Sequence, residues 1–533
     1  MVIAPGVQKL IGEYDGWRKQ FEFREEEEVI SVDEVAARVA SFYEKLREIV
    51  DWRGEHLLRK TAIERILKRR LTVQKVHEDF AENFLAELVR GGHFPNNRIS
   101  FDQVDEIQAV IQKYVFIAER FREGQQRNRK NPTDWLFSIA AVEIEEALSK
   151  PRREHALIEL MTEDLENRTQ LVVRKQDTER VLPEGEKRLQ IYVAVQRALF
   201  KLDPTTTAYH ILEKFYPDWK VPTQETLAYV GGHLEVLHEN IQKILVHPYG
   251  ERFYQLAEKY DTPYLILHDI LSDDSTRFSE LINNPPTFEE AIRHSYNARH
   301  ARLKRRIGRA ALYSVLSVFI TKVLIAFLIE IPVDRYFQQG INYLAIGLSV
   351  AIPSFLMMVL IFTAKTTSQR NFERVMMEVI KIIQPRQRTE PFKIFPPHRK
   401  TGLLASIVYG FYLLSFLLSF GALIWGLQEL RFSPSSIVIF LMFISLVLFG
   451  GTRIRQQARE LMIEPTREGF LYNIFDIFSL PMIQVGRWLS GQIVRYNVFL
   501  LVLNFLVEVP FQMFVEFLEQ WRGLLREKKE EIH

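Results

Sequence analysis

The chain has 533 residues, of which 26% are charged and 47% hydrophobic, values that an ordinary soluble protein also shows. Its formal net charge is only +2, so the chain as a whole is not a polyanion-binding particle. It contains no cysteine, which excludes disulfides, thiol catalysis and cysteine-ligated zinc or iron–sulfur sites.

Residues 1–300 alternate charged and hydrophobic residues in the way of a helical globular chain. Start and stop signals predict helices at 31–52, 55–90, 101–123, 133–149, 152–172, 186–202, 205–215, 223–246 and 249–260. Capping boxes are predicted at Ser31–Glu34, Ser100–Gln103 and Thr287–Glu290. The polar stretch 124–132 predicts a subdomain break or a flexible loop. We therefore expect an all-α cytoplasmic domain over 1–300 with little room for strands.

No motif in this region indicates a reaction. Gly231-Gly232 lacks the lysine or third glycine of a phosphate-binding loop, and no HExxH motif occurs. His233, His238 and His247 have spacings that do not place ligands on one helical face, so surface or core histidines are the preferred interpretation. Isolated basic runs are common on helix surfaces, so we expect no nucleic-acid partner. We also expect no catalytic residue, no cofactor and no metal ion, while enzyme activity is left open.

Four apolar runs after residue 310 are each long enough to cross a bilayer as a helix. They cover residues 310–331, 341–364, 402–427 and 434–451. Only Gly308 interrupts the helical pattern between Thr287 and Pro332, so a helix outside the membrane should continue into the first span as a rod of roughly 65 Å. Region 301–464 is therefore predicted to be a transmembrane helical bundle.

Basic residues beside the spans predict their orientation. They gather before the first span and after the second and fourth, whereas the other two connections are short and nearly uncharged in sum. The candidates for contact with anionic lipid headgroups are Arg302, Lys304, Arg305, Arg306, Arg309, Arg399, Lys400, Arg453 and Arg455. We expect an integral protein of a plasma or inner membrane, with both termini in the cytoplasm and anionic lipids as partners. The chain begins without a basic segment leading into an apolar one, so no cleaved secretory signal is expected.

Two apolar helical faces follow the second and fourth spans, within 372–383 and 461–478. Each is flanked by arginine or lysine, which fits a helix on an anionic membrane surface and equally a helix packed on the soluble domain. The segments 375–378 and 461–464 also share a pattern of residue types. This echo leaves a repeat of two hairpins open.

Region 465–533 predicts amphipathic, membrane-associated helices. Its segment 496–518 is long enough to cross, but a polar stripe that includes Asn504, Glu508 and Gln512 runs along one face. The basic residues that follow would lie on the wrong side if this segment crossed, so a helix in the interface is preferred. A crossing helix would instead line an aqueous path in an oligomer.

Lys322 is the ionisable residue near the middle of a predicted span, and it joins Asn504, Glu508 and Gln512 as an intramembrane polar candidate. Glu508 and Glu330 are its candidate partners in a functional role. Snorkelling to a headgroup, or pairing that only holds helices together, is expected at least equally. The preferred function is a non-catalytic, membrane-anchored scaffold or adaptor whose cytoplasmic domain docks an unknown protein. The alternative is a transporter or channel subunit with a cytoplasmic regulatory domain, and a homo-oligomer is left open.

Overall fold

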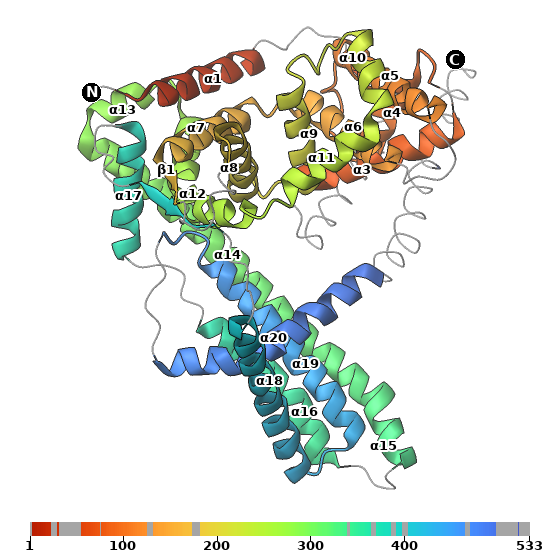
Figure 1. The fold of residues 1–533 in the computed structure, drawn as a ribbon, viewed down its shortest axis with the longest axis vertical. Coiled ribbons are helices and arrows are strands. Elements are labelled where there is room, and N and C mark those ends of the chain that lie inside the picture. Colours follow the sequence, from red (N-terminus) through yellow and green to blue (C-terminus); the bar gives the residue numbers. More distant parts are fainter. Residues whose placement is uncertain are drawn as a thin grey trace, which may run out of the picture. The chain divides into compact units, whose positions relative to one another are not determined.

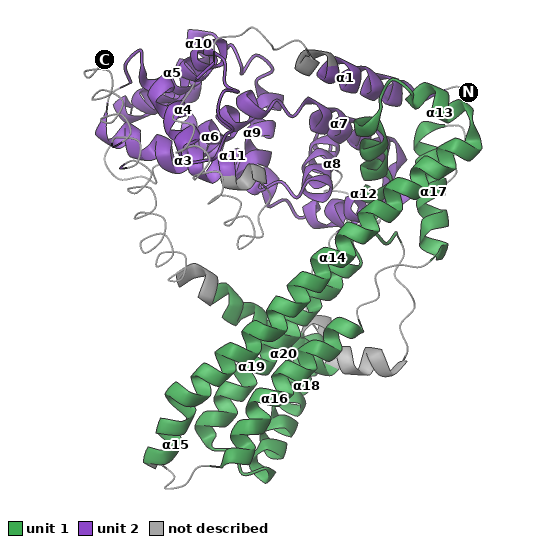
Figure 2. Cartoon of the chain, turned by 180° about the vertical axis from the view of Figure 1, so that it is seen from behind, with its two compact units in different colours: residues 1–2, 259–388, 397–498 green, residues 3–258, 389–396, 499–533 purple. Residues whose placement is uncertain are grey.

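The structure is a computed structural model that describes residues 3–22, 29–30, 55–74, 76–124, 132–172, 182–337, 342–363, 369–384, 391–396, 403–463 and 470–496, with Phe517 and Trp521. These residues form an all-α protein with one small sheet of two strands (Figure 1). The chain divides into two compact units that alternate along the sequence (Figure 2). Unit 1 contains 259–388 and 397–498, and unit 2 contains 3–258 and 389–396. The predicted limits of the domains at 300 and 464 stay predictions.

Unit 2 is a bundle of helices. Its helices are α1 (Pro5–Glu22), α3 (Glu55–Val73), α4 (Phe80–Arg90), α5 (Phe101–Glu123), α6 (Thr133–Ser149), α7 (Arg152–Arg168), α8 (Glu184–Leu199), α9 (Pro204–Phe215), α10 (Gln224–Gly232) and α11 (Leu234–Leu245), and the boundary with unit 1 falls inside α12 (Gly250–Asp273). The helices predicted over 101–123 and 133–149 are confirmed to the residue. The helix predicted over 31–52 lies outside the described residues.

Two predicted helices of unit 2 are each divided in the structure. The polar run 74–79 separates α3 from α4 because it offers almost no apolar side chain to bury. The helix predicted over 223–246 breaks at His233, after Gly231-Gly232. A Cβ on Gly231 would lie 2.8 Å from the Arg120 Cβ, so the close approach of α10 to α5 requires a glycine there.

The core of unit 2 is centred on α5 and α6. The apolar side chains of α5 recur every three or four residues and are buried, which makes one helical face. The predicted capping box at its start is confirmed, because the backbone N–H of Ser100 donates to the Gln103 side chain at 3.3 Å. The capping box predicted at Thr287 is wrong. There the helix begins two residues earlier, at Pro285, because proline suits the first helical position.

The small sheet of unit 2 was not predicted. Strand β1 (Thr169–Leu171) pairs in parallel with β2 (Phe392–Ile394), which comes from the connection between the second and third apolar runs. The helix predicted over 152–172 therefore ends at Arg168, whose guanidinium lies 4.4 Å from the centre of the Phe392 ring. Residues 169–172 are rich in β-branched and apolar side chains, and the partner strand fixes their extended form.

Unit 1 contains the long apolar helices. After α12 come α13 (Phe278–Asn283), α14 (Pro285–Ile325), the π-helix η2 (Ala326–Glu330), α15 (Ile331–Phe337), α16 (Tyr343–Phe362), α17 (Gln369–Ile383), α18 (Leu403–Glu429), α19 (Pro434–Ala458) and α20 (Phe470–Tyr496). Among the described residues, four stretches are long and apolar enough to cross a membrane, at Pro285–Tyr336, Tyr343–Phe362, Ser406–Glu429 and Pro434–Ala458. The continuous rod is confirmed, since α14 has 41 residues and a length of about 62 Å.

Three segments of unit 1 meet at the buried side chain of Asn371 on α17. Its amide nitrogen donates to the Tyr296 hydroxyl on α14 at 3.0 Å and to the Leu461 carbonyl after α19 at 2.7 Å. Its amide oxygen accepts from the Ile463 backbone N–H at 3.0 Å. One residue thus joins the segment before the first apolar run to the segments after the second and the fourth.

Helix α17 packs on α14 through an aromatic contact as well. The rings of Tyr296 and Phe372 meet edge to face with centroids 5.3 Å apart, and the Arg293 guanidinium lies 4.5 Å from the Phe372 centroid. Phe372, Val375 and Val379 are buried. The two alternatives for this apolar face are contact with the membrane surface and packing on protein. In the structure its buried side chains pack on protein.

Helix α20 crosses the long helices obliquely near one end of the bundle, as Figure 1 shows. It is held by side chains of α18, because the Tyr412 hydroxyl donates to Gln484 at 2.8 Å and the Ser419 hydroxyl donates to the Phe478 carbonyl at 2.8 Å. A Cβ on Gly486 would lie 2.1 Å from the Ser445 carbonyl oxygen of α19. The backbones of α19 and α20 can therefore approach this closely only because residue 486 is glycine.

Replacing Gly486 with alanine should separate α20 from α19, because the added methyl group meets backbone that cannot rotate away. We expect a loss of about 1–3 kcal/mol, measured by thermal unfolding in detergent micelles. Gly491 lies on the same helix with nothing within 4 Å of its Cβ position, so Gly491→Ala is the matched control. It should leave stability unchanged or raise it by up to about 1 kcal/mol. Equal effects of the two variants would contradict the close crossing.

Replacing Asn371 with aspartate keeps its shape but removes the two donated hydrogen bonds. A buried carboxylate would then face the Leu461 carbonyl, so the free energy of unfolding should fall by at least about 2 kcal/mol. Protease cleavage should also become faster, because α17 loses its tie to the bundle. The control is Glu373→Gln on the exposed face of α17, which should change neither measurement. Wild-type stability of Asn371→Asp would show that the junction does not depend on this amide.

Candidate functional site

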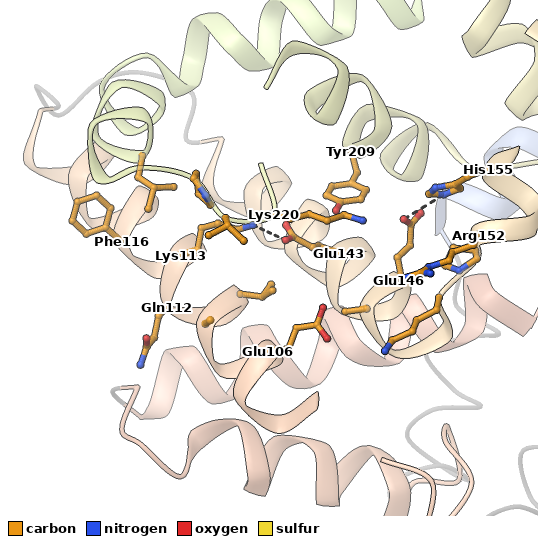
Figure 3. Close-up of a pocket in the computed structure, with 18 of the residues that line it drawn as sticks. Glu106, Gln112, Lys113, Phe116, Glu143, Glu146, Arg152, His155, Tyr209 and Lys220 are labelled. Carbon is orange, nitrogen blue, oxygen red and sulfur yellow. Dashed lines mark hydrogen bonds and ion pairs between the residues drawn. The ribbon is translucent and has the colours of Figure 1, made fainter. Parts of the chain in front are cut away.

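One cavity of unit 2 has a volume of about 860 Å³. It is lined by side chains of α5, α6, α7, α9 and the connection before α10, and its walls carry both apolar and charged groups. In the view of Figure 3, Phe116 and the facing pair Glu146 and His155 lie at opposite ends, with Lys113 and Glu143 between them. A mixed lining of this kind suits a ligand or peptide that carries both apolar and ionic groups.

The middle of the cavity wall is a buried polar network. The Lys113 ammonium donates to Glu143 at 2.5 Å and to the Trp219 carbonyl at 2.9 Å. The Tyr114 hydroxyl and the Trp219 indole N–H donate to the other Glu143 oxygen at 2.7 and 3.1 Å. Burial raises the pKa of the Glu143 carboxyl and lowers that of the Lys113 ammonium. Because each member has a partner, this network fixes α5, α6 and the segment before α10 relative to one another.

At the other end, three helices bring two imidazoles to one carboxylate. The Glu146 oxygens lie 2.5 Å from His210 Nε2 and 3.4 Å from His155 Nε2. The two imidazole rings meet edge to face with centroids 4.8 Å apart. Burial alone would raise the pKa of Glu146, but the two histidines outweigh it and hold that pKa well below its ordinary value. Burial likewise opposes the charge on His155, yet the adjacent Glu146 raises its pKa.

Local sequence explains why these groups converge. Glu146 lies in the last turn of α6, and Lys150 ends that helix in the left-handed conformation with φ of 48°. Pro151 is the N-cap residue of α7, so His155 lies in the first turn of that helix. Helix α9 brings His210 to the opposite side, and its start is fixed by Asp203, whose carboxylate accepts from the backbone N–H groups of the first turn.

No protein-family model, curated protein or solved structure matches this chain.

The sequence-predicted intramembrane candidates divide into those that the structure describes and those it does not. Lys322 is fully buried and forms an ion pair with Glu330, which is also fully buried and accepts from the Ser349 hydroxyl at 3.3 Å. The ammonium also lies 5.3 Å from the centre of the Phe443 ring. Glu330 is the last residue of the π-helix η2, which begins four residues after Lys322. This helix brings the two charged residues together, because it fits more residues into a turn than an α-helix does. Asn504, Glu508 and Gln512 lie outside the described residues.

The basic candidates lie on an exposed face of the α14 rod. Arg302, Lys304, Arg305, Arg306 and Arg309 are exposed, whereas the apolar residues between them are buried against the bundle. Two of them form ion pairs within unit 1, Arg302 with Asp269 at 3.4 Å and Arg306 with Glu460. Arg453 is exposed beside Phe449, Arg455 is partly buried, and Arg399 and Lys400 lie outside the described residues. Contact of these groups with lipid stays a prediction.

Sequence reasoning overlooked the group formed by Glu146, His155 and His210. It weighed His233, His238 and His247 because they are close in sequence, and the structure gives each of these a separate neighbour, respectively Tyr229, Trp135 and Glu186. His155 and His210 are far apart in the chain, so spacing carries no signal for them. A weaker signal was present for His210, which lies on the buried face of the amphipathic helix α9.

Asp203 should show a pH-dependent effect on stability. Partial burial opposes its charge, but Lys60 and the hydrogen bonds from Thr206 outweigh this and hold the pKa of Asp203 below its ordinary value. The ion pair of Asp203 with Lys60 therefore stabilises the folded state near neutral pH. This stabilisation is lost as the pH falls through the folded-state pKa of Asp203. Asp203→Asn keeps a good helix cap, so it should cost about 1 kcal/mol at pH 7 and progressively less below about pH 4.

Thermal unfolding of the wild type and the variant across pH 3–7 measures this difference. Asp203→Ala is the comparison, because it also removes the helix cap and should add a further loss of about 1 kcal/mol at every pH. A difference between wild type and Asp203→Asn that stays constant down to pH 3 would contradict the role of the Lys60 pair.

Proposed function

We propose that this protein is a membrane-anchored, non-catalytic scaffold: unit 1 holds it in the bilayer, and unit 2 docks a partner on the cytoplasmic side. The observation that carries the proposal is the closed ion pair of Lys322 and Glu330. Both side chains are fully buried, and their charges are matched inside the helical bundle. A charge that serves transport must meet water or substrate at some stage. Both charges of this pair are fully buried and face each other, so we infer that the pair holds the helices together.

The hydrogen bonds of the basic connections support the expected topology. The junction at Asn371 joins segments before the first apolar run and after the second and fourth, which are the three basic flanks. Strand β2 follows the second run and pairs with β1 of the N-terminal part. Segments that bond to one another lie on the same side of a membrane, so each pair of runs would return the chain to that side. The positive-inside rule assigns that side to the cytoplasm.

The cavity of unit 2 supports the docking role. At about 860 Å³ it can hold several side chains of another chain, and it offers apolar surface at Phe116 and Leu227. Lys150 and Arg152 line the same cavity. These groups favour a partner segment that combines apolar residues with a carboxylate.

Introduced cysteines can test the topology, because the natural chain contains none. Glu225→Cys in unit 2 and Met377→Cys on α17 should react with an impermeant thiol reagent from the cytoplasmic side of oriented membranes. Glu429→Cys, at the last residue of α18 before the turn to α19, should react only from the other side. All three positions are exposed. Labelling of Glu225→Cys and Glu429→Cys from the same side would refute the proposed arrangement.

Single and double substitutions of Lys322 and Glu330 can distinguish a structural role of this ion pair from a role in transport. Lys322→Met leaves the Glu330 carboxylate unpaired in an apolar bundle and should cost about 3–5 kcal/mol, while Lys322→Met with Glu330→Gln should recover most of that loss. Thermal unfolding in detergent measures both. The purified wild-type chain in liposomes should give no ion flux above empty liposomes. If the wild type shows an ion flux and the stable double variant does not, the scaffold proposal is refuted and a transporter is favoured.

A further inference from the structure

Two imidazoles and a carboxylate meet in unit 2 with their donor atoms all within 4.8 Å of one another. They come from three separate helices, α6, α7 and α9. We propose that Glu146, His155 and His210 form a binding site for a divalent first-row transition ion of the Zn²⁺ type. This inference goes beyond the scaffold function and stands independently of it.

The donor set selects the class of metal. Two imidazole nitrogens with one carboxylate oxygen suit Zn²⁺ and its neighbours in the first transition row, whereas Mg²⁺ and Ca²⁺ prefer all-oxygen sites. Donor atoms about 2.1 Å from a tetrahedral ion lie roughly 3.4 Å apart. The distance from His155 Nε2 to the nearer Glu146 oxygen is 3.4 Å. The pair of His210 and Glu146, at 2.5 Å, shares a proton that the metal would displace.

The orientation of His210 is already fixed by a second residue. Its Nδ1 lies 2.6 Å from the Gln196 Oε1, and Gln196 is fully buried on α8. With Nδ1–H donating to this amide oxygen, Nε2 is the ring nitrogen that faces Glu146, and its lone pair becomes available to a metal once the shared proton is displaced. Metal-binding histidines characteristically donate their other ring N–H in this way. The Nε2 atom of His155 is also buried, and it faces Glu146 without forming a well-aligned hydrogen bond.

The site is accessible from a second cavity. All three residues line a cavity of about 370 Å³, and Glu146 and His155 also line the larger cavity of about 860 Å³. A metal bound at this shared wall would have three protein ligands. Such an ion keeps at least one coordination position for water or for a donor of a bound partner.

The test uses the full chain in detergent, purified without a polyhistidine tag and treated with chelator. Titration with Zn²⁺ should show one equivalent bound per chain by calorimetry and should raise the Tm, with reversal by chelator. Titration with Co²⁺ should give the visible absorption of a low-coordinate site with nitrogen ligands. Mg²⁺ at the same concentration should leave the Tm unchanged.

His155→Gln and His210→Gln should each lower the Zn²⁺ affinity at least tenfold and abolish the Co²⁺ spectrum. His155 is partly exposed, so its variant should keep the wild-type circular dichroism and Tm without metal. Gln196→Leu keeps all three ligands and should weaken binding by about 10–100-fold. His233→Gln is the control, because His233 is exposed and lies outside the site. The proposal is overturned if Zn²⁺ does not bind stoichiometrically, or if its binding is unchanged in His155→Gln and His210→Gln. The three side chains would then form only a hydrogen-bonded cluster.

Discussion

The packing of unit 1 depends on one buried amide. Asn371 can satisfy both its nitrogen and its oxygen only if Tyr296, Leu461 and Ile463 all reach it. Together with Asn371 these residues lie on three segments separated by apolar helices. A buried amide left without these partners would cost about 1–3 kcal/mol, whereas an apolar side chain at this position would tolerate many arrangements. The geometry of hydrogen bonding therefore selects one arrangement of the segments, where hydrophobic contact alone would not.

The packing of the apolar helices of unit 1 is also determined by a few specific contacts. Among helices that face hydrocarbon, burying more apolar surface gains little, so specificity comes from polar pairs and from close backbone contact. Lys322 and Glu330 form such a polar pair. Gly486 allows a close backbone contact with Ser445. Gly451 adds another close approach, because a Cβ there would lie 2.5 Å from the Leu360 side chain. Polar and small residues thus determine which faces meet.

Sequence patterns predicted what depends on neighbours along the chain, and they failed where distant residues decide. The bounds of α5 and α6, the four apolar runs and the continuity of α14 all follow from local periodicity and capping. The pairing of β1 with β2 joins segments that lie more than two hundred residues apart in the sequence, and neither strand has a strong signal of its own. The convergence of His155 with His210 is of the same kind, because it exists only once α7 and α9 have packed around α6.

On helix α6, packing gives different pKa values to glutamates that look equivalent in the sequence. Glu143, Glu145 and Glu146 lie within one turn. Burial raises the pKa of Glu143 in its network with Lys113, and burial raises the pKa of Glu145 to about 7 even though Arg59 opposes the shift. The histidines beside Glu146 hold its pKa low against the same burial. Since the three carboxyls share a helix and differ by its rotation, the identity of the facing helix decides which one is a charged ligand. The ionised oxygen next to two imidazoles is the one that a cation would meet.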